Sequence, residues 1–175
     1  MTLAPHAPVE DFTLPDTDGA PVGLAPGDAA ATVVVFTCNH CPYALAWHDR
    51  LLDVARDYAE RGVRVLMVNP NDAERYPADS YEAMQKRVEG EDWPAPYLYD
   101  ESQEVARGFG AQTTPDVFVV TRDGQLAYRG APDADHGDPS LRAEWLRAAL
   151  DDVLAGRPVA RPETRPVGCS IKWRA

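Results

Sequence analysis

A short β-branched run, a long amphipathic segment and a second apolar run constrain the fold of this chain more than any other feature. Residues 33–36 are apolar at every position, which is typical of a strand buried on both faces. Pro42 suits the first turn of a helix, and apolar residues then recur at helical spacing until Gly62. Residues 63–68 form a second buried strand pattern. This order predicts a βαβ unit with a right-handed crossover.

Two cysteines occupy the turn between the first of these strands and the helix. Cys38 and Cys41 are separated by Asn39 and His40. Such a pair can close a small disulfide, and a helix N-terminus stabilises a thiolate through its unpaired N–H groups and partial positive charge. We expect Cys38 to be the accessible, low-pKa thiolate that attacks disulfides, and Cys41 to be the more buried thiol that resolves the mixed disulfide. His40 adds positive charge nearby and should shift the redox potential in the oxidising direction.

The same spacing also occurs in zinc sites, where a pair of cysteines supplies half of the ligands. The remaining ligands would have to come from Cys169 or from the four histidines, and none of these forms a second paired motif. We therefore expect no metal and no organic cofactor. A non-catalytic zinc-binding module remains an alternative.

Length, charge and terminal sequence limit the classes of function. The 175 residues suit one domain, and a net charge of -11 argues against nucleic acid or an anionic membrane as a partner. No apolar run approaches membrane-spanning length, and residues 1–8 lack the basic and apolar segments of a secretory signal. These features predict a cytoplasmic protein, a compartment in which structural disulfides are rare and cysteines are more often reactive.

Turn and capping signals predict the other elements. An Asp-Gly turn within residues 9–24 predicts an N-terminal β-hairpin, and Asp79 or Ser80 can cap a helix that runs to about residue 88. Asp138 followed by Pro139 predicts the start of the last helix. The remaining expected elements are a strand at 97–99, a short helix at 101–109, a strand at 117–120 and a strand at 126–129.

With this order of elements, the chain resembles the thioredoxin superfamily and, more closely, its peroxiredoxin-like branch. Two segments carry the resemblance: Phe36-Thr37-Cys38-Asn39-His40-Cys41-Pro42-Tyr43 and Val167-Gly168-Cys169-Ser170-Ile171-Lys172-Trp173. It implies an α/β thioredoxin fold with a central mixed sheet, helices on both faces, an N-terminal β-hairpin and one helical insertion. We expect a thioredoxin-like domain over residues 1–157 and a proline-rich tail, residues 158–175, packed on it.

The resemblance also implies a function and a substrate contact. Thr114-Pro115 resembles the cis-proline loop that faces the active-site disulfide, and the backbone of such a loop can pair with an extended substrate chain. The implied activity is thiol–disulfide exchange through Cys38 and Cys41 with protein or small-thiol substrates. The expected reducing partner is a thioredoxin-type reductase or glutathione.

A thiol peroxidase of the peroxiredoxin-like type is the alternative enzyme. Peroxiredoxin peroxidases carry Pro-x-x-x-Thr-x-x-Cys. Counting back from Cys41 places Cys38 and Val34 at the Thr and Pro positions, and counting back from Cys38 places Val35 and Ala31 there. Neither register supplies the motif.

Cys169 is the third cysteine and lies in the tail beside Gly168. It is a possible third redox thiol if the tail folds back over the domain, with Ile171 and Trp173 as apolar anchors; otherwise it is a small buried hydrophobe. Four further charged residues were candidates for acid–base roles, and we read them as solvated surface: Glu104, Arg107, Asp116 and Asp133.

Overall fold

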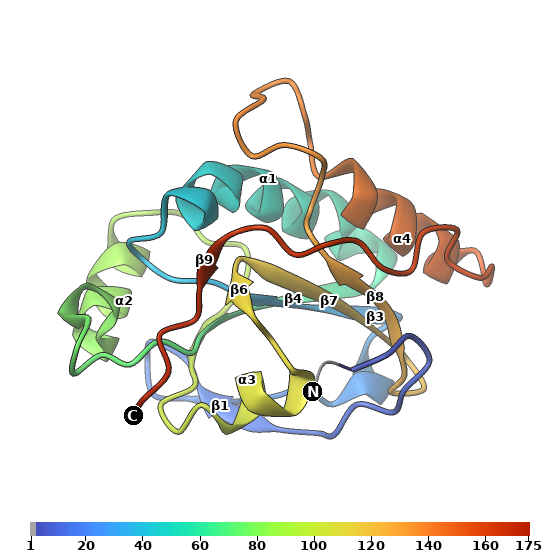
Figure 1. The fold of residues 1–175 in the computed structure, drawn as a ribbon. Helices are drawn as coiled ribbons and strands as arrows, with labels where there is room; N and C mark the ends of the chain where they lie inside the picture. The colour runs from blue at the N-terminus through green and yellow to red at the C-terminus, as the bar shows by residue number, and fades with distance from the viewer. Residues whose placement is uncertain (1–2) are drawn as a thin grey trace.

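A computed structural model describes residues 3–175. Met1 and Thr2, which belong to the segment without the features of a secretory signal, residues 1–8, lie outside the described residues. The centre of the structure is a mixed sheet with helices on both faces, as predicted (Figure 1). The strand order is β5-β4-β3-β7-β8. Their bounds are β3 Ala31–Phe36, β4 Val63–Asn69, β5 Tyr97–Tyr99, β7 Asp116–Thr121 and β8 Leu126–Gly130.

Strand β3 lies in the middle of this sheet, and all of its residues are buried. They tolerate burial because each of them is apolar or small. It runs parallel to β4, with Val34 opposite Leu66, and antiparallel to β7, with Val34 opposite Phe118. The parallel β3–β4 pair confirms the predicted βαβ unit. The C-terminal end of β3 therefore delivers the cysteine turn from a strand that is held on both sides.

Helices cover the two faces of the sheet unequally. Helix α1 (Pro42–Tyr58) and helix α4 (Glu144–Leu154) pack on one face, where Trp47 and Leu146 join the core. The other face is covered by helix α3 (Glu104–Phe109) and by the predicted N-terminal hairpin, which consists of β1 (Thr13–Pro15) and β2 (Pro21–Gly23). Helix α2 (Tyr81–Glu89) is the insertion between β4 and β5.

Ser80, and not Asp79, caps helix α2. The Ser80 hydroxyl accepts a hydrogen bond from the Ala83 N–H at 3.1 Å, which satisfies one of the free donors of the first turn. Asp79 ends a 3-10 turn, Pro77–Asp79, and its side chain is fully buried. The cap and the buried carboxylate therefore belong to neighbouring residues with separate tasks.

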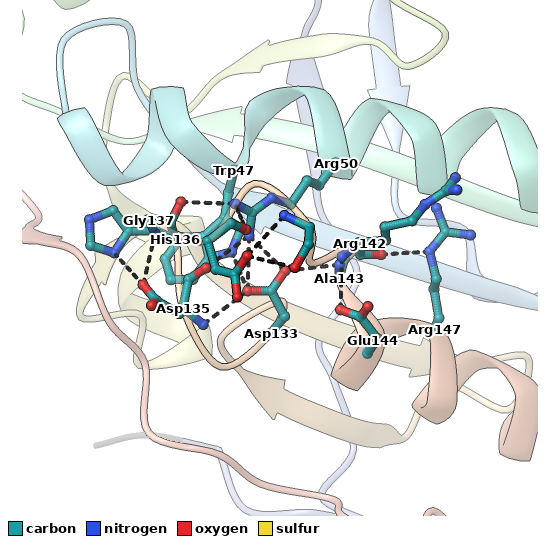
Figure 2. Close-up of polar contacts among 12 residues, drawn as sticks. Trp47, Arg50, Asp133, Asp135, His136, Gly137, Arg142, Ala143, Glu144 and Arg147 are labelled. Atoms are coloured by element: carbon teal, nitrogen blue, oxygen red, sulfur yellow. Dashed lines mark hydrogen bonds and ion pairs between the residues drawn. The ribbon is translucent and has the colours of Figure 1, made fainter.

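The predicted start of the last helix at Asp138 is wrong, because α4 begins at Glu144. Residues 131–143 form a loop instead, and the buried carboxylate of Asp133 fastens it to α1 (Figure 2). Asp133 accepts hydrogen bonds from the Trp47 indole N–H at 2.9 Å, from the Arg50 guanidinium at 2.9 and 3.0 Å, and from the Ala143 N–H at 2.9 Å.

The reading of Asp133 and Asp116 as solvated surface is also wrong. Asp116 is fully buried at the start of β7 and lies 3.4 Å from the Arg129 guanidinium. Burial raises the pKa of the Asp116 carboxyl to about 6, against the lowering effect of the Gln112 N–H and Arg129. Asp116 pairs with the buried Arg129 and Asp133 with the largely buried Arg50, whereas Glu104 and Arg107 are exposed.

The tail crosses the molecule from the end of α4 to the cysteine turn (red in Figure 1). It first runs along the edge strand β8, where the Arg129 N–H donates to the Pro162 carbonyl at 3.1 Å and the Thr164 N–H donates to the Arg129 carbonyl at 3.0 Å. It ends in strand β9 (Cys169–Ser170), which pairs antiparallel with β6 (Thr113–Thr114). Within residues 3–175, no helix combines the length and the apolar character that crossing a bilayer requires.

Candidate active site

The two cysteines of the turn lie at different points relative to helix α1. The helix begins at Pro42, so Cys41 is its N-cap. Cys38 lies outside the helix, directly after Thr37, the residue that follows β3. Cys38 is 1% exposed and Cys41 is 0% exposed. The expectation that Cys38 is the accessible thiol is therefore wrong. All three cysteines are free thiols.

The sulfur of Cys41 is surrounded by hydrogen-bond donors. The thiols of Cys38 and Cys169 and the backbone N–H groups of Ala44 and Cys169 all point at it, and together they lower the pKa of Cys41 to about 4, with the Cys38 thiol as the largest cause and burial acting against them. The neutral thiol has one acceptor, the Thr114 carbonyl at 3.2 Å. The anion is thus better satisfied than the thiol, and the thiolate of the pair belongs to Cys41.

The environment of Cys38 favours the protonated thiol. Its hydrogen bond to Cys41 is the largest cause that raises the pKa of Cys38 above its ordinary range, and burial and the negative charge of Asp79 act in the same direction. The Thr114 hydroxyl, 3.5 Å from the sulfur, and the His40 N–H oppose this rise. The expected low pKa of Cys38 is therefore also corrected, because the anion-binding position is the N-cap.

Asn39 fixes the shape of the turn, and sequence reasoning assigned it no role. Its N–H donates to Asp79 at 2.7 Å, and its side-chain oxygen accepts from Arg87 at 3.0 Å and from the Tyr97 hydroxyl at 2.8 Å. Arg87 also donates to the Cys38 carbonyl at 3.1 Å. These partners come from α2 and β5, far away in sequence, so no local pattern could have indicated them.

His40 lies beside a buried carboxylate that the sequence offered only as a helix cap. Its Nδ1 is 2.5 Å from Asp79 Oδ2, and its ring stacks on Tyr76 with 5.8 Å between centroids. Asp79 also accepts from the Asn71 amide at 2.9 Å. Among the described residues, Cys38, His40 and Asp79 bring three possible metal ligands within 4.8 Å of one another. Each carboxylate oxygen of Asp79 already accepts a hydrogen bond, Oδ1 from the Asn39 N–H and Oδ2 from the Asn71 amide. This arrangement fits Asp79 as a partner of His40 better than as a metal ligand.

The Thr114-Pro115 loop closes the site from the opposite side. Its peptide bond is cis. Thr114 contacts the sulfurs of both turn cysteines, and on β9 its partner in the ladder is Cys169. The edge that was expected to receive a substrate chain is therefore paired with the protein's own tail. Gly168 permits this contact, since a Cβ at that position would lie 2.3 Å from the Thr114 carbonyl oxygen.

Comparison of the whole chain with solved structures shows close likeness to two bacterial proteins of undefined activity. An uncharacterized conserved protein from Geobacillus kaustophilus is 42% identical, with a TM-score of 0.92 over 98% of this chain and 93% of that one. A hypothetical protein from Sinorhizobium meliloti is 36% identical, with a TM-score of 0.93 over 100% of this chain and 97% of that one. No curated protein matches this sequence.

More distant structures define the fold class. A putative thiol:disulfide interchange protein DsbE from Chlorobium tepidum is 19% identical, with a TM-score of 0.72 over 87% of this chain and 99% of that one. Together with the mixed sheet and its helices, this likeness identifies the thioredoxin fold, as the sequence predicted. Residues 5–129 match the AhpC/TSA family, and the chain belongs to that family. It is therefore a redox protein of the thiol-dependent class.

Proposed function

We propose that this protein is a thiol–disulfide oxidoreductase that cycles between a Cys38/Cys41 dithiol and a Cys38–Cys41 disulfide. The observation that carries the proposal is that Cys38 and Cys41 pack in one buried cluster, in which Thr114 contacts both sulfurs, at 3.5 and 3.2 Å. In this contact the Cys38 thiol lowers the pKa of Cys41. This contact brings together a stabilised anion and a second thiol, as dithiol–disulfide exchange requires.

The proposed reduction of a client proceeds in two exchanges. The Cys38 proton passes to Cys41 along their hydrogen bond, and the Cys38 sulfur attacks one client sulfur, so that a mixed disulfide forms and one client thiolate leaves. Cys41 then gives its proton to the client thiolate that has left and attacks the Cys38 sulfur, which releases the second client thiolate and closes the Cys38–Cys41 bond. Two electrons pass to the client, and an external dithiol or glutathione restores the reduced pair.

Two groups next to the sulfurs would assist these steps. The His40 ring contacts the Asp79 carboxylate through Nδ1, which would weaken the effect of the Asp79 charge on Cys38 and so favour the thiolate form of the pair. The backbone of Thr114 and Pro115 would pair with an extended client segment at the edge where β9 now lies. A reducing compartment such as the cytoplasm would keep the dithiol available.

Trapping of mixed disulfides tests the proposal. Cys41→Ser should accumulate client adducts on Cys38, because the resolving sulfur is gone, whereas Cys38→Ser should form no such adduct and should lose dithiol-dependent reduction of insulin. Full reductase activity of Cys38→Ser would refute the mechanism. Stoichiometric zinc in the purified reduced protein would favour the metal-binding alternative.

Thiol peroxidase activity is the second candidate, and membership of the AhpC/TSA family favours it. The donors around Cys41 would stabilise a peroxide-reactive thiolate there. Consumption of hydrogen peroxide that depends on an external dithiol and is lost in Cys41→Ser would support this activity. A peroxide rate equal to that of free cysteine would exclude it.

A further inference from the structure

The C-terminal tail brings a third thiol to the proposed redox pair. Strand β9 places Cys169 opposite Thr114, the residue that touches both Cys38 and Cys41. Cys169 packs against the buried cluster of Cys38, Cys41 and Ala44, and hydrogen bonding from its thiol and its backbone N–H lowers the pKa of Cys41. Cys41 is thus the middle sulfur of the group, with Cys38 as one hydrogen-bonding partner and Cys169 as the other.

The position of Cys169 is built into the fold. Beyond β9, the Ile171 N–H donates to the Gln112 carbonyl at 3.1 Å, the Lys172 N–H donates to the Asn71 side chain at 2.9 Å, and Gln103 donates to the Lys172 carbonyl at 2.9 Å. Ile171 is 3% exposed and belongs to the core on the α3 side of the sheet. Main-chain hydrogen bonds and a buried anchor therefore fix the tail on both sides of the contact with Thr114.

The tail is also joined to the groups that surround Cys38. Asn71, which accepts from Lys172, donates through its amide to Asp79, the carboxylate next to His40. The tail's docking contacts and the redox turn therefore share one buried polar network. An ordinary loose terminus would need neither this network nor the close approach at Gly168.

We propose that Cys169 is a redox partner of Cys41, so that the oxidised protein holds its disulfide either as Cys38–Cys41 or as Cys41–Cys169. This inference rests on the proposed function and extends it to the tail. The exchange is internal: the Cys169 thiolate attacks the Cys41 sulfur of the Cys38–Cys41 bond, Cys38 leaves as a thiolate, and the proton lost by Cys169 ends on Cys38. One disulfide breaks, one forms, and no further oxidant is consumed.

The exchange would change which sulfurs face a partner. Cys169 is partly exposed, whereas Cys38 and Cys41 are buried, so the Cys41–Cys169 bond presents a sulfur that an external reductant can reach. The β9 segment then occupies the edge proposed for clients, in the manner of a bound substrate strand. The tail would act as the chain's own exchange substrate.

Disulfide mapping tests the proposal. The wild-type protein and its single Ser variants are oxidised with one equivalent of diamide, which takes up two electrons and two protons, then blocked with N-ethylmaleimide and mapped by mass spectrometry. Wild type should contain both Cys38–Cys41 and Cys41–Cys169 peptides. Cys38→Ser should form Cys41–Cys169, at about tenfold or more above the yield of any Cys38–Cys169 bond in Cys41→Ser.

A shifted thiol is the matched control. In a Cys38→Ser background, the pair Cys169→Ser with Ser170→Cys moves the tail thiol by one residue to the opposite face of β9, and the cross-link to Cys41 should disappear. An equal yield would mean that a mobile tail, and not its position, makes the bond, and this result would overturn the proposal.

The remaining outcomes separate this inference from the proposed function. If Cys169→Ser forms Cys38–Cys41 while Cys41–Cys169 is absent from wild type, whatever Cys38→Ser forms, the third-thiol role is wrong and the oxidoreductase proposal stands. If no variant forms an intramolecular disulfide and insulin is not reduced, the proposed function is wrong as well. The wild-type map decides the question even if a variant fails to fold.

Discussion

At the residue scale, the position of a cysteine in the turn matters more than its order in the sequence. Cys41 caps helix α1 and collects thiol and backbone donors, whereas Cys38 faces Asp79. A thiolate is stabilised where donors converge, and a nearby carboxylate opposes it. The second cysteine of the motif therefore carries the negative charge in the reduced protein.

A thiolate titration checks this assignment. The ultraviolet thiolate absorbance of the reduced protein should rise in a step near pH 4, the value to which the donors lower the pKa of Cys41. Cys38→Ala should move this step to higher pH because it removes the strongest donor, and Cys169→Ala should move it less. Cys41→Ser should abolish the step. A step that survives in Cys41→Ser and disappears in Cys38→Ser would reverse the assignment.

His40 and Asp79 should act on the redox potential in opposite directions. His40→Ala removes the ring that contacts the Asp79 carboxylate. The charge of Asp79 then acts more strongly on Cys38 and destabilises the reduced thiolate state, so the potential should fall by on the order of 30 mV, equivalent to about 1.4 kcal/mol. Asp79→Asn removes a charge that raises the pKa of Cys38, so the potential should rise. Equilibration with glutathione buffers measures both shifts, and a more oxidising His40→Ala would contradict the argument.

At the element scale, the sequence predicts strands and helices better than it predicts what joins them. The apolar runs of β3, β4 and β7 and the helical spacing of α1 are local patterns, and the structure contains the corresponding elements. The start of α4 was misplaced because Asp138-Pro139 imitates a helix start, while the buried Asp133 holds that segment as a loop. A carboxylate whose partners are many residues away leaves no periodic signal.

The same limit applies to the site. The two cysteines and the cis Thr114–Pro115 bond were found from motifs, whereas the roles of Asn39, Asp79 and Asn71 depend on contacts between separate elements. Burial of Cys38 was also missed, since a two-cysteine motif does not show what covers it. The N-cap position of Cys41 does have a signal in the sequence, because Cys41 directly precedes Pro42, the first helical residue.

Asp133 should be among the most costly polar residues to remove. Asp133→Ala leaves the Arg50 guanidinium, whose side chain is 11% exposed, and the Trp47 indole N–H without their acceptor. Loss of one partner of a buried ion pair costs about 3–5 kcal/mol. The free energy of unfolding in urea should drop accordingly, while Asp53→Ala, which removes an exposed pair with Arg56, should cost less than about 1 kcal/mol. Equal effects would contradict the role of Asp133.

Asp116 should make stability fall as pH rises through its titration range. Its folded pKa of about 6 lies above the ordinary 3.8, so the folded state retains a proton that the unfolded state has lost. The stabilisation is complete below the unfolded pKa and is lost as pH rises towards about 6, with a slope of at most about 1.4 kcal/mol per pH unit. Urea unfolding of wild type and Asp116→Asn at several pH values should show this slope in the difference between their free energies of unfolding, because the other carboxylates contribute equally to both proteins. Parallel curves would contradict it.

At the scale of the whole molecule, the tail connects one edge of the sheet to the redox turn. It pairs with β8 near Arg129 and then with β6 at Thr114. An exposed sheet edge invites pairing with another chain, and the tail removes part of that edge. Docking of the tail therefore serves both the sheet and the site.

Gly168 is the position that tests this docking. In Gly168→Ala, the new Cβ would meet the Thr114 carbonyl oxygen at 2.3 Å, so β9 should separate from β6 while the domain stays folded. Cys169 should then react faster with iodoacetamide, and trypsin should cleave the tail more readily after Lys172. Gly108→Ala, with no atom within 4 Å of its Cβ, is the matched control and should change neither rate. An unchanged Cys169 rate in Gly168→Ala would show that the tail tolerates the clash.

The three cysteines should become exposed to solvent at different rates, because Cys38 directly follows the central part of the sheet, at the end of β3 and Thr37, whereas Cys169 lies in the C-terminal tail. Amides in a strand bonded on both sides exchange with solvent only when the whole domain opens, whereas chain ends open by local fraying. Cys38 and Cys41 therefore belong to the unit that opens last, and Cys169 belongs to a segment that opens and closes many times while the rest of the molecule stays intact. Deuterium uptake should accordingly begin at residues 165–175 and reach the backbone of β3 only at the rate of global unfolding.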